Sequence, residues 1–201
     1  MDGSDRVKVS TRIARLATRQ GARVATAESL TGGLLASDLA LAPHAALWYR
    51  GGVVACAPEV RRDVLYVRSG PIVSERAVLD MADGVALLLG ATVAVAVSGV
   101  AGPLPSEGSA PGTVWFGVRH DGSTGAELHH FAGAPDAVCE ATRDTALDLL
   151  LRGLDPPQVL PAARRQFGVG GFGPGWDPWR PATREEAAVV LSRVVHLRDV
   201  G

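Results

Sequence analysis

Several residue types that would suggest a function are scarce in this sequence. Its two cysteines, Cys56 and Cys139, match neither the spacing of a metal site nor a disulfide framework. All but one of the 20 basic residues are arginine, and 21 acidic residues balance them to a net charge of −1. Without an excess of positive charge, nucleic-acid binding is not expected. Reduced thiols, and residues 1–5 that lack a signal-peptide pattern, predict a cytoplasmic protein.

Long hydrophobic runs are scarce as well. Residues 84–106 carry no charge, but several glycines, Pro103 and Pro105 interrupt them. The pattern also changes at Gly90, from helical periodicity to an alternation of valine and alanine over residues 93–97. This favours a helix followed by a buried strand over a membrane span. With 47% hydrophobic and 20% charged residues, the composition is that of a globular domain and excludes disorder for most of the chain.

The order of the expected elements favours an α/β fold. Helices are predicted at residues 5–20, 33–41, 58–66, 75–89 and 135–152. Strands are predicted at residues 23–27, 50–56, 92–97, 113–119 and 126–131, the last two forming a hairpin across Asp121 and Gly122. Alternating helices and strands predict a three-layer α/β/α sandwich with a mixed, mostly parallel sheet over residues 1–154.

The composition changes after this domain. Residues 155–181 are rich in proline and glycine and include Trp176 and Trp179, which we expect to anchor the segment on an apolar surface. A short final helix is predicted from Thr183, because Thr183 and Glu186 have the spacing of a capping box. Residues 155–201 are therefore interpreted as an extension of the α/β domain.

Two glycine-containing turns follow predicted strands. Residues 28–33 (Glu-Ser-Leu-Thr-Gly-Gly) lie where a strand ends and a helix begins, which is where ligands bind in open α/β sheets. The free N–H groups of that helix would suit a phosphate or an oxyanion, and Ser29 is placed to be a nucleophile. An ordinary helix cap at Ser29 or Thr31 explains the same spacing. Residues 98–103 (Ser-Gly-Val-Ala-Gly-Pro) form either an ordinary turn or the second wall of one crevice.

Taken together, the segments from residue 5 to residue 154 resemble one family, the C-terminal domain of the competence/damage-inducible protein CinA, whose stand-alone form is nicotinamide mononucleotide deamidase. The resemblance is carried by residues 25–33 (Ala-Thr-Ala-Glu-Ser-Leu-Thr-Gly-Gly), 50–54 (Arg-Gly-Gly-Val-Val), 73–75 (Val-Ser-Glu), 98–103 and 111–114 (Pro-Gly-Thr-Val). It implies hydrolysis of the carboxamide of nicotinamide mononucleotide to nicotinate mononucleotide and ammonia. It also implies a serine nucleophile activated by lysine, no metal or cofactor, and a homodimer.

The resemblance also implies which residues form the site. Ser29 matches the nucleophile. The expected substrate-binding residues are Glu28, Thr31, Gly32, Gly33, Ser98, Gly99, Gly102 and Thr113.

The sequence departs from the family at the positions that the family uses for catalysis and substrate contact. The family pattern Gly-Gly-Val-Val-Thr-Tyr-Ser-Asn-Glu-Ala-Lys aligns with residues 51–61, so that Cys56 replaces its tyrosine and Arg61 its catalytic lysine. A guanidinium has a pKa above about 12 and does not readily take a proton from a serine. The family's Gly-Asp-Arg-x-x-Val-Arg aligns with residues 133–139, where both arginines are missing. Arg143, one helical turn beyond Cys139, is a candidate to replace one of them.

These departures leave two hypotheses. The first is an active amidohydrolase that uses Ser29 and a base other than Arg61; His44 is a candidate by its chemistry, since histidine can be neutral near pH 7. Cys56 as a replacement nucleophile is a variant of this hypothesis, although a small buried cysteine is the commoner role. The second is a catalytically impaired relative that binds a nucleotide or a protein partner and uses Arg61 as an anion contact.

Overall fold

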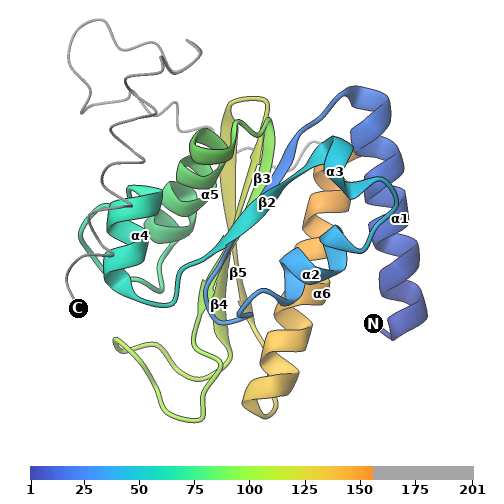
Figure 1. Cartoon of the computed structure of the whole chain (residues 1–201). Coiled ribbons are helices and arrows are strands. Elements are labelled where there is room, and N and C mark those ends of the chain that lie inside the picture. Colours follow the sequence, from blue (N-terminus) through green and yellow to red (C-terminus); the bar gives the residue numbers. More distant parts are fainter. Residues whose placement is uncertain (156–201) are drawn as a thin grey trace, which may run out of the picture. The chain divides into compact units, whose positions relative to one another are not determined.

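The computed structural model describes residues 1–155, and a five-stranded mixed sheet lies at their centre (Figure 1). The predicted extension with Trp176, Trp179 and the helix from Thr183 lies outside the described residues. The elements in chain order are α1 (Gly3–Gln20), β1 (Val24–Glu28), α2 (Leu34–Ala40), α3 (Ala45–Trp48), β2 (Tyr49–Val54), α4 (Pro58–Leu65), α5 (Glu75–Leu89), β3 (Val93–Gly99), β4 (Thr113–His120), β5 (Ser123–His130) and α6 (Pro135–Leu154).

The sheet has the order β2-β1-β3-β4-β5. Strand β1 pairs in parallel with both β2 and β3, whereas β4 pairs antiparallel with β3 and with β5. Strand β4 therefore runs against the direction of the other strands of this sheet. The predicted mixed, mostly parallel sheet is confirmed.

Helices cover both faces of the sheet, as Figure 1 shows. In β3 the valines Val93, Val95 and Val97 join a buried cluster with residues of α1, α2 and α6. The intervening Ala94 and Ala96 join a second cluster with residues of α4 and α5. Since successive side chains of a strand point to opposite faces, the valine–alanine alternation creates one bulky and one shallow face. The three-layer α/β/α sandwich is confirmed.

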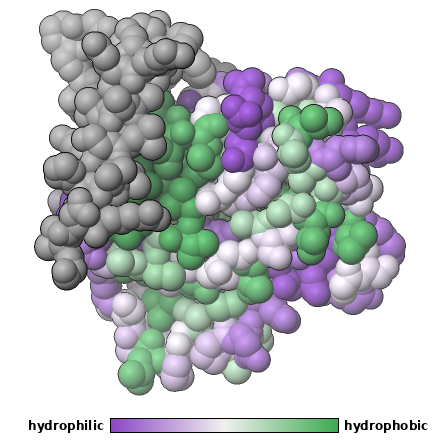
Figure 2. Space-filling view, viewed as in Figure 1, coloured by the Kyte–Doolittle hydropathy of each residue, from purple (hydrophilic) through white to green (hydrophobic). Residues whose placement is uncertain are grey.

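Glycines let α5 approach the shallow face closely. A Cβ on Gly117 of β4 would lie 2.3 Å from the carbonyl oxygen of Val78 in α5, and a Cβ on Gly84 of α5 would lie 2.0 Å from that of Leu65. Both distances are far below van der Waals contact, so a side chain at Gly117 would push α5 away from the sheet, and one at Gly84 would push α5 away from the end of α4. On its outer side α5 carries the half-exposed Leu87, and Figure 2 shows apolar residues gathering over this helix.

The helix ends follow the sequence signals. The Asp2 carboxylate accepts a hydrogen bond from the Asp5 N–H at the start of α1, and Gly21, with φ of 63°, ends that helix. Ser74 caps α5 in the same way, and Pro58 occupies the first turn of α4. Residues 84–106 form the end of α5, strand β3 and part of a loop, and no helix within residues 1–155 is long and apolar enough to span a bilayer.

Besides shifts of one or two residues at other element ends, two details differ from the sequence prediction. Strand β5 begins at Ser123 rather than at residue 126, because Asp121 and Gly122, with φ of 46° and 81°, form a two-residue turn. His120 then pairs directly with Ser123, which extends the hairpin to its tip. The short helix α3 was not predicted; its four residues are too few to give a periodic signal.

Candidate active site

The carboxyl ends of the three parallel strands bring together residues that are distant in the sequence. Ser29 directly follows β1, Ser98 is the penultimate residue of β3, and Arg61 lies in α4, shortly after β2. Because parallel strands end at one edge of the sheet, these side chains meet there. All three are buried, with 6%, 0% and 3% of their surface exposed, respectively.

The Arg61 guanidinium spans the ends of all three strands. Its Nη2 donates to Ser29 Oγ at 2.6 Å and to the Cys56 carbonyl at 3.1 Å. Nε donates to the Ala55 carbonyl at 2.8 Å, and Nη1 reaches Ser98 Oγ at 3.5 Å. Ser98 Oγ in turn donates to the carbonyl of Ile72 at 2.6 Å. We call Ser29, Arg61 and Ser98 the Arg61 cluster.

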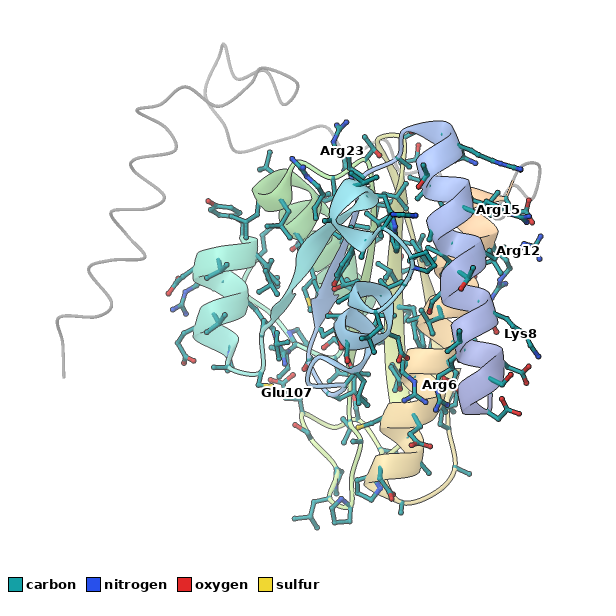
Figure 3. The ribbon with its side chains drawn as sticks, turned by 45° about the vertical axis from the view of Figure 1, so that its right-hand side comes forward. Arg6, Lys8, Arg12, Arg15, Arg23 and Glu107 are labelled. Atoms are coloured by element: carbon teal, nitrogen blue, oxygen red, sulfur yellow. The ribbon has the colours of Figure 1, made fainter. Side chains whose placement is uncertain are left out.

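The charge of Arg61 is not paired directly with a carboxylate in the part of the chain that the structure describes. Within residues 1–155, no carboxylate forms an ion pair with its guanidinium. Burial lowers the pKa of Arg61, and the nearby Cys56 and Glu107 act in the opposite direction. Glu107, which Figure 3 shows at the end of the sheet where the β1–α2 turn lies, uses its carboxylate to accept the Ile72 N–H at 2.7 Å.

The start of α2 does not offer the anion site expected from the sequence. The fully buried Glu28 turns its carboxylate onto this helix and accepts the backbone N–H groups of Gly33, Leu35 and Ala36 at 3.0, 3.2 and 2.8 Å. It also accepts the Thr31 hydroxyl at 2.7 Å. A carboxylate at a helix N-terminus satisfies both the free N–H groups and the partial positive charge. The expected oxyanion or phosphate position there is therefore already occupied, and Glu28 and Thr31 hold the turn.

The two glycines of this turn allow its left-handed backbone conformation. Gly32 and Gly33 have φ of 59° and 103°, which favour glycine. Gly32 is exposed, its N–H donates to the Ser29 carbonyl at 3.2 Å, and a Cβ at this position would meet open space.

The second turn brings Ser98 to the cluster, while its neighbours pack against β4. A Cβ on Gly99 would lie 2.6 Å from the Thr113 carbonyl, so glycine is required there by close packing. Gly102 has φ of 104° and faces Pro111. The Thr113 hydroxyl lies 3.4 Å from His130 Nδ1 across the β4–β5 pair. Among the expected binding residues of this half, Ser98 is the one whose side chain is hydrogen-bonded to Arg61.

Both cysteines lie against the Ser29 turn. The exposed Cys56 places its Sγ 3.6 Å from the Ser29 carbonyl, and Cys139 of α6 places its Sγ 3.1 Å from the Leu30 carbonyl. Burial raises the pKa of the Cys139 thiol. Cys139 replaces a family arginine, and its position beside the turn was missed because sequence spacing gives no distance between α6 and β1.

Two candidates from the sequence lie elsewhere. His44 precedes α3, near the start of β2, whereas Ser29 follows the end of β1. Because the starts of β1 and β2 are paired, His44 and Ser29 lie towards opposite ends of these two strands. Arg143 is buried and forms ion pairs with Asp38 at 3.4 Å and Asp144 at 3.0 Å. It therefore joins α6 to α2 and is not part of the Arg61 cluster, and the strand register places His44 away from this cluster as well.

The chemistry of the cluster favours binding an anion over deprotonating Ser29. A serine becomes nucleophilic when a neighbour accepts its proton. Ser29 Oγ instead accepts a hydrogen bond from a guanidinium, which has donors and no acceptor. Within residues 1–155, no group of three or more His, Cys, Asp or Glu side chains gathers where it would hold a metal ion.

Comparisons with known proteins agree with this architecture. The model of the CinA C-terminal domain matches residues 6–154. A CinA-like protein of Frankia casuarinae is 38% identical over 144 residues, which are 69% of this chain and 33% of that protein. A putative competence-damage inducible protein of Bacillus subtilis is 31% identical over 141 residues, 68% of this chain and 34% of that protein. The chain thus spans about a third of the length of these curated relatives.

Solved structures give the same result. A CinA superfamily protein of Klebsiella pneumoniae superposes with a TM-score of 0.71 at 37% identity, covering 74% of this chain and 97% of that one. One from Escherichia coli gives a TM-score of 0.72 at 30% identity, covering 75% and 92%. The family model, these relatives and the strand order around the Arg61 cluster lead to one conclusion: this chain belongs to the CinA C-terminal domain family.

Proposed function

We propose that this chain binds a small anionic nucleotide at the Arg61 cluster and that Ser29 does not hydrolyse it. The observation that carries the proposal is the 2.6 Å hydrogen bond from Arg61 Nη2 to Ser29 Oγ. In the family that this sequence resembles, a lysine stands at this position as the base. A lysine can be desolvated to a neutral amine that accepts a proton, whereas the guanidinium stays charged. The cluster keeps the scaffold of a serine hydrolase and lacks its proton acceptor.

The family resemblance suggests that the ligand is a nucleotide, and the site suggests that it is an anion. The matched motifs around Ser29 and Ser98 are those of a domain that acts on nicotinamide mononucleotide. Here the buried cation of Arg61 lacks an ion-pair partner within the described residues, so a bound anion would offset the cost of its burial.

Hydrolysis of nicotinamide mononucleotide is the second candidate function. It is favoured by the retention of Ser29, whose alkoxide form the adjacent guanidinium would stabilise. It would require a proton acceptor that comes from the substrate or from water.

Ammonia release and ligand-induced stabilisation separate the two functions. With nicotinamide or nicotinate mononucleotide added in excess, we expect the melting temperature of the full chain to rise, because a ligand that binds the native state stabilises it. We expect ammonia release from nicotinamide mononucleotide to equal that of Ser29→Ala. Turnover that disappears in Ser29→Ala would establish the hydrolase instead. No thermal shift with either nucleotide would contradict both functions.

A further inference from the structure

The hydrogen bonds of Arg61 leave a specific set of donors for a ligand. A guanidinium has five N–H groups. Nε and Nη2 of Arg61 are engaged with the carbonyls of Ala55 and Cys56 and with Ser29 Oγ. Nη1 has one contact, to Ser98 Oγ, and at 3.5 Å it is the longest of the set. One N–H of Nη1 therefore has no partner among the described residues.

Ser29 supplies a second donor beside it. Its Oγ accepts from Arg61, and within residues 1–155 its own proton has no hydrogen-bond acceptor. Ser98 differs, because its hydroxyl already donates to Ile72. The ligand-facing groups of the cluster are thus the hydroxyl of Ser29 and an N–H of Arg61. Both groups can donate, and a separate hydrogen bond from Arg61 Nη2 to Ser29 Oγ holds the two side chains together.

Exposed residues lie beside the carbonyl of Ser29. Gly32 and Cys56 both contact this carbonyl, through N–H at 3.2 Å and Sγ at 3.6 Å, and both are exposed. Gly32 has open space where a Cβ would stand.

From this arrangement we infer that the Arg61 cluster selects a carboxylate over the carboxamide of the same shape, so that the preferred ligand is the acid form of a pyridine nucleotide. The inference rests on the proposed function and adds the chemical form of the ligand. A carboxylate accepts on both oxygens and neutralises the buried cation. A carboxamide offers one acceptor oxygen, and although the second lone pair of the Ser29 hydroxyl can accept from its NH₂ group, the amide leaves the buried cation of Arg61 without a counter-charge.

The test compares two ligands that differ in this group alone. Binding of nicotinate and nicotinamide mononucleotide to the full chain is measured by calorimetry at one pH and salt concentration. We expect the acid to bind at least about tenfold more tightly, the ratio expected when one charged hydrogen bond is gained. Both ligands carry the same phosphate, so a difference reports on the carboxyl group. Equal affinities, or tighter binding of the amide, would overturn the inference while leaving the proposed function in place; binding of neither would overturn the proposed function.

Variants of Arg61 assign the preference to its charge. In Arg61→Gln we expect the acid and the amide to bind with similar affinity, whereas Arg61→Lys should still prefer the acid. Arg62→Gln is the matched control, because Arg62 lies on the same helix but is exposed and pairs with Asp63. Circular dichroism verifies that each variant is folded. The comparison of the two nucleotides on the wild-type chain does not depend on these variants. A preference for the acid that survives in folded Arg61→Gln would refute the role of Arg61.

Discussion

Replacing the buried Glu28 by glutamine tests how the site turn is held. The Glu28 carboxylate accepts four hydrogen bonds, three through Oε2, from Thr31, Gly33 and Leu35, and one through Oε1, from Ala36. Glutamine has a single acceptor oxygen. In its better orientation that oxygen keeps the three bonds of Oε2, and the new NH₂ group faces the N–H of Ala36.

The expected loss of stability can be worked out from these contacts. A buried donor without an acceptor costs about 1–3 kcal/mol. Loss of the negative charge at the N-terminus of α2 costs up to about 2 kcal/mol in a buried geometry. We therefore expect Glu28→Gln to lower the free energy of unfolding by about 1–5 kcal/mol, a substantial part of the total of about 5–15 kcal/mol that is usual for a domain.

Urea unfolding monitored by circular dichroism measures this loss as a shift of the midpoint at constant slope. Glu75→Gln is the matched control, since Glu75 also lies in the first turn of a helix but is exposed. We expect the control to lose less than about 1 kcal/mol. A loss in Glu28→Gln no larger than that of the control would refute the capping role of Glu28.

Three further predictions follow from burial and packing. Burial raises the pKa of Tyr49 to about 12; in Tyr66→Phe, where Tyr49 is the remaining tyrosine, near-ultraviolet absorbance should show ionisation near that pH when folded and near 10 in urea. Folding thus favours the neutral phenol, and this contribution to stability is present below pH 10 and lost as the pH rises to about 12. Cys56 should react with a disulfide reagent before Cys139, which is less exposed and whose pKa burial raises; equal rates in the Cys56→Ser and Cys139→Ser variants would contradict this. Gly117→Ala should cost about 1–3 kcal/mol in urea unfolding, because its Cβ would overlap a carbonyl of α5.

Much of the fold could be predicted because its signals are local. The alternation of valine and alanine in residues 93–97, the cap at Ser74 and the Asp121–Gly122 turn each act within a few residues, and the structure has each of them. Family motifs extended this to the identity of the domain. The homodimer and the cytoplasmic location stay predictions.

The site was less predictable because it depends on contacts between distant segments. Residue identity and the family motifs were enough to show that Arg61 stands in place of a lysine and that a guanidinium is a poor base. Contacts in the folded chain were needed to show that Arg61 lies across three strand ends, that Glu28 faces its own helix rather than a ligand, and that Arg143 pairs with Asp38. Residue type and spacing fix local geometry and protonation chemistry, whereas the partner of a side chain is set by which elements the sheet brings together.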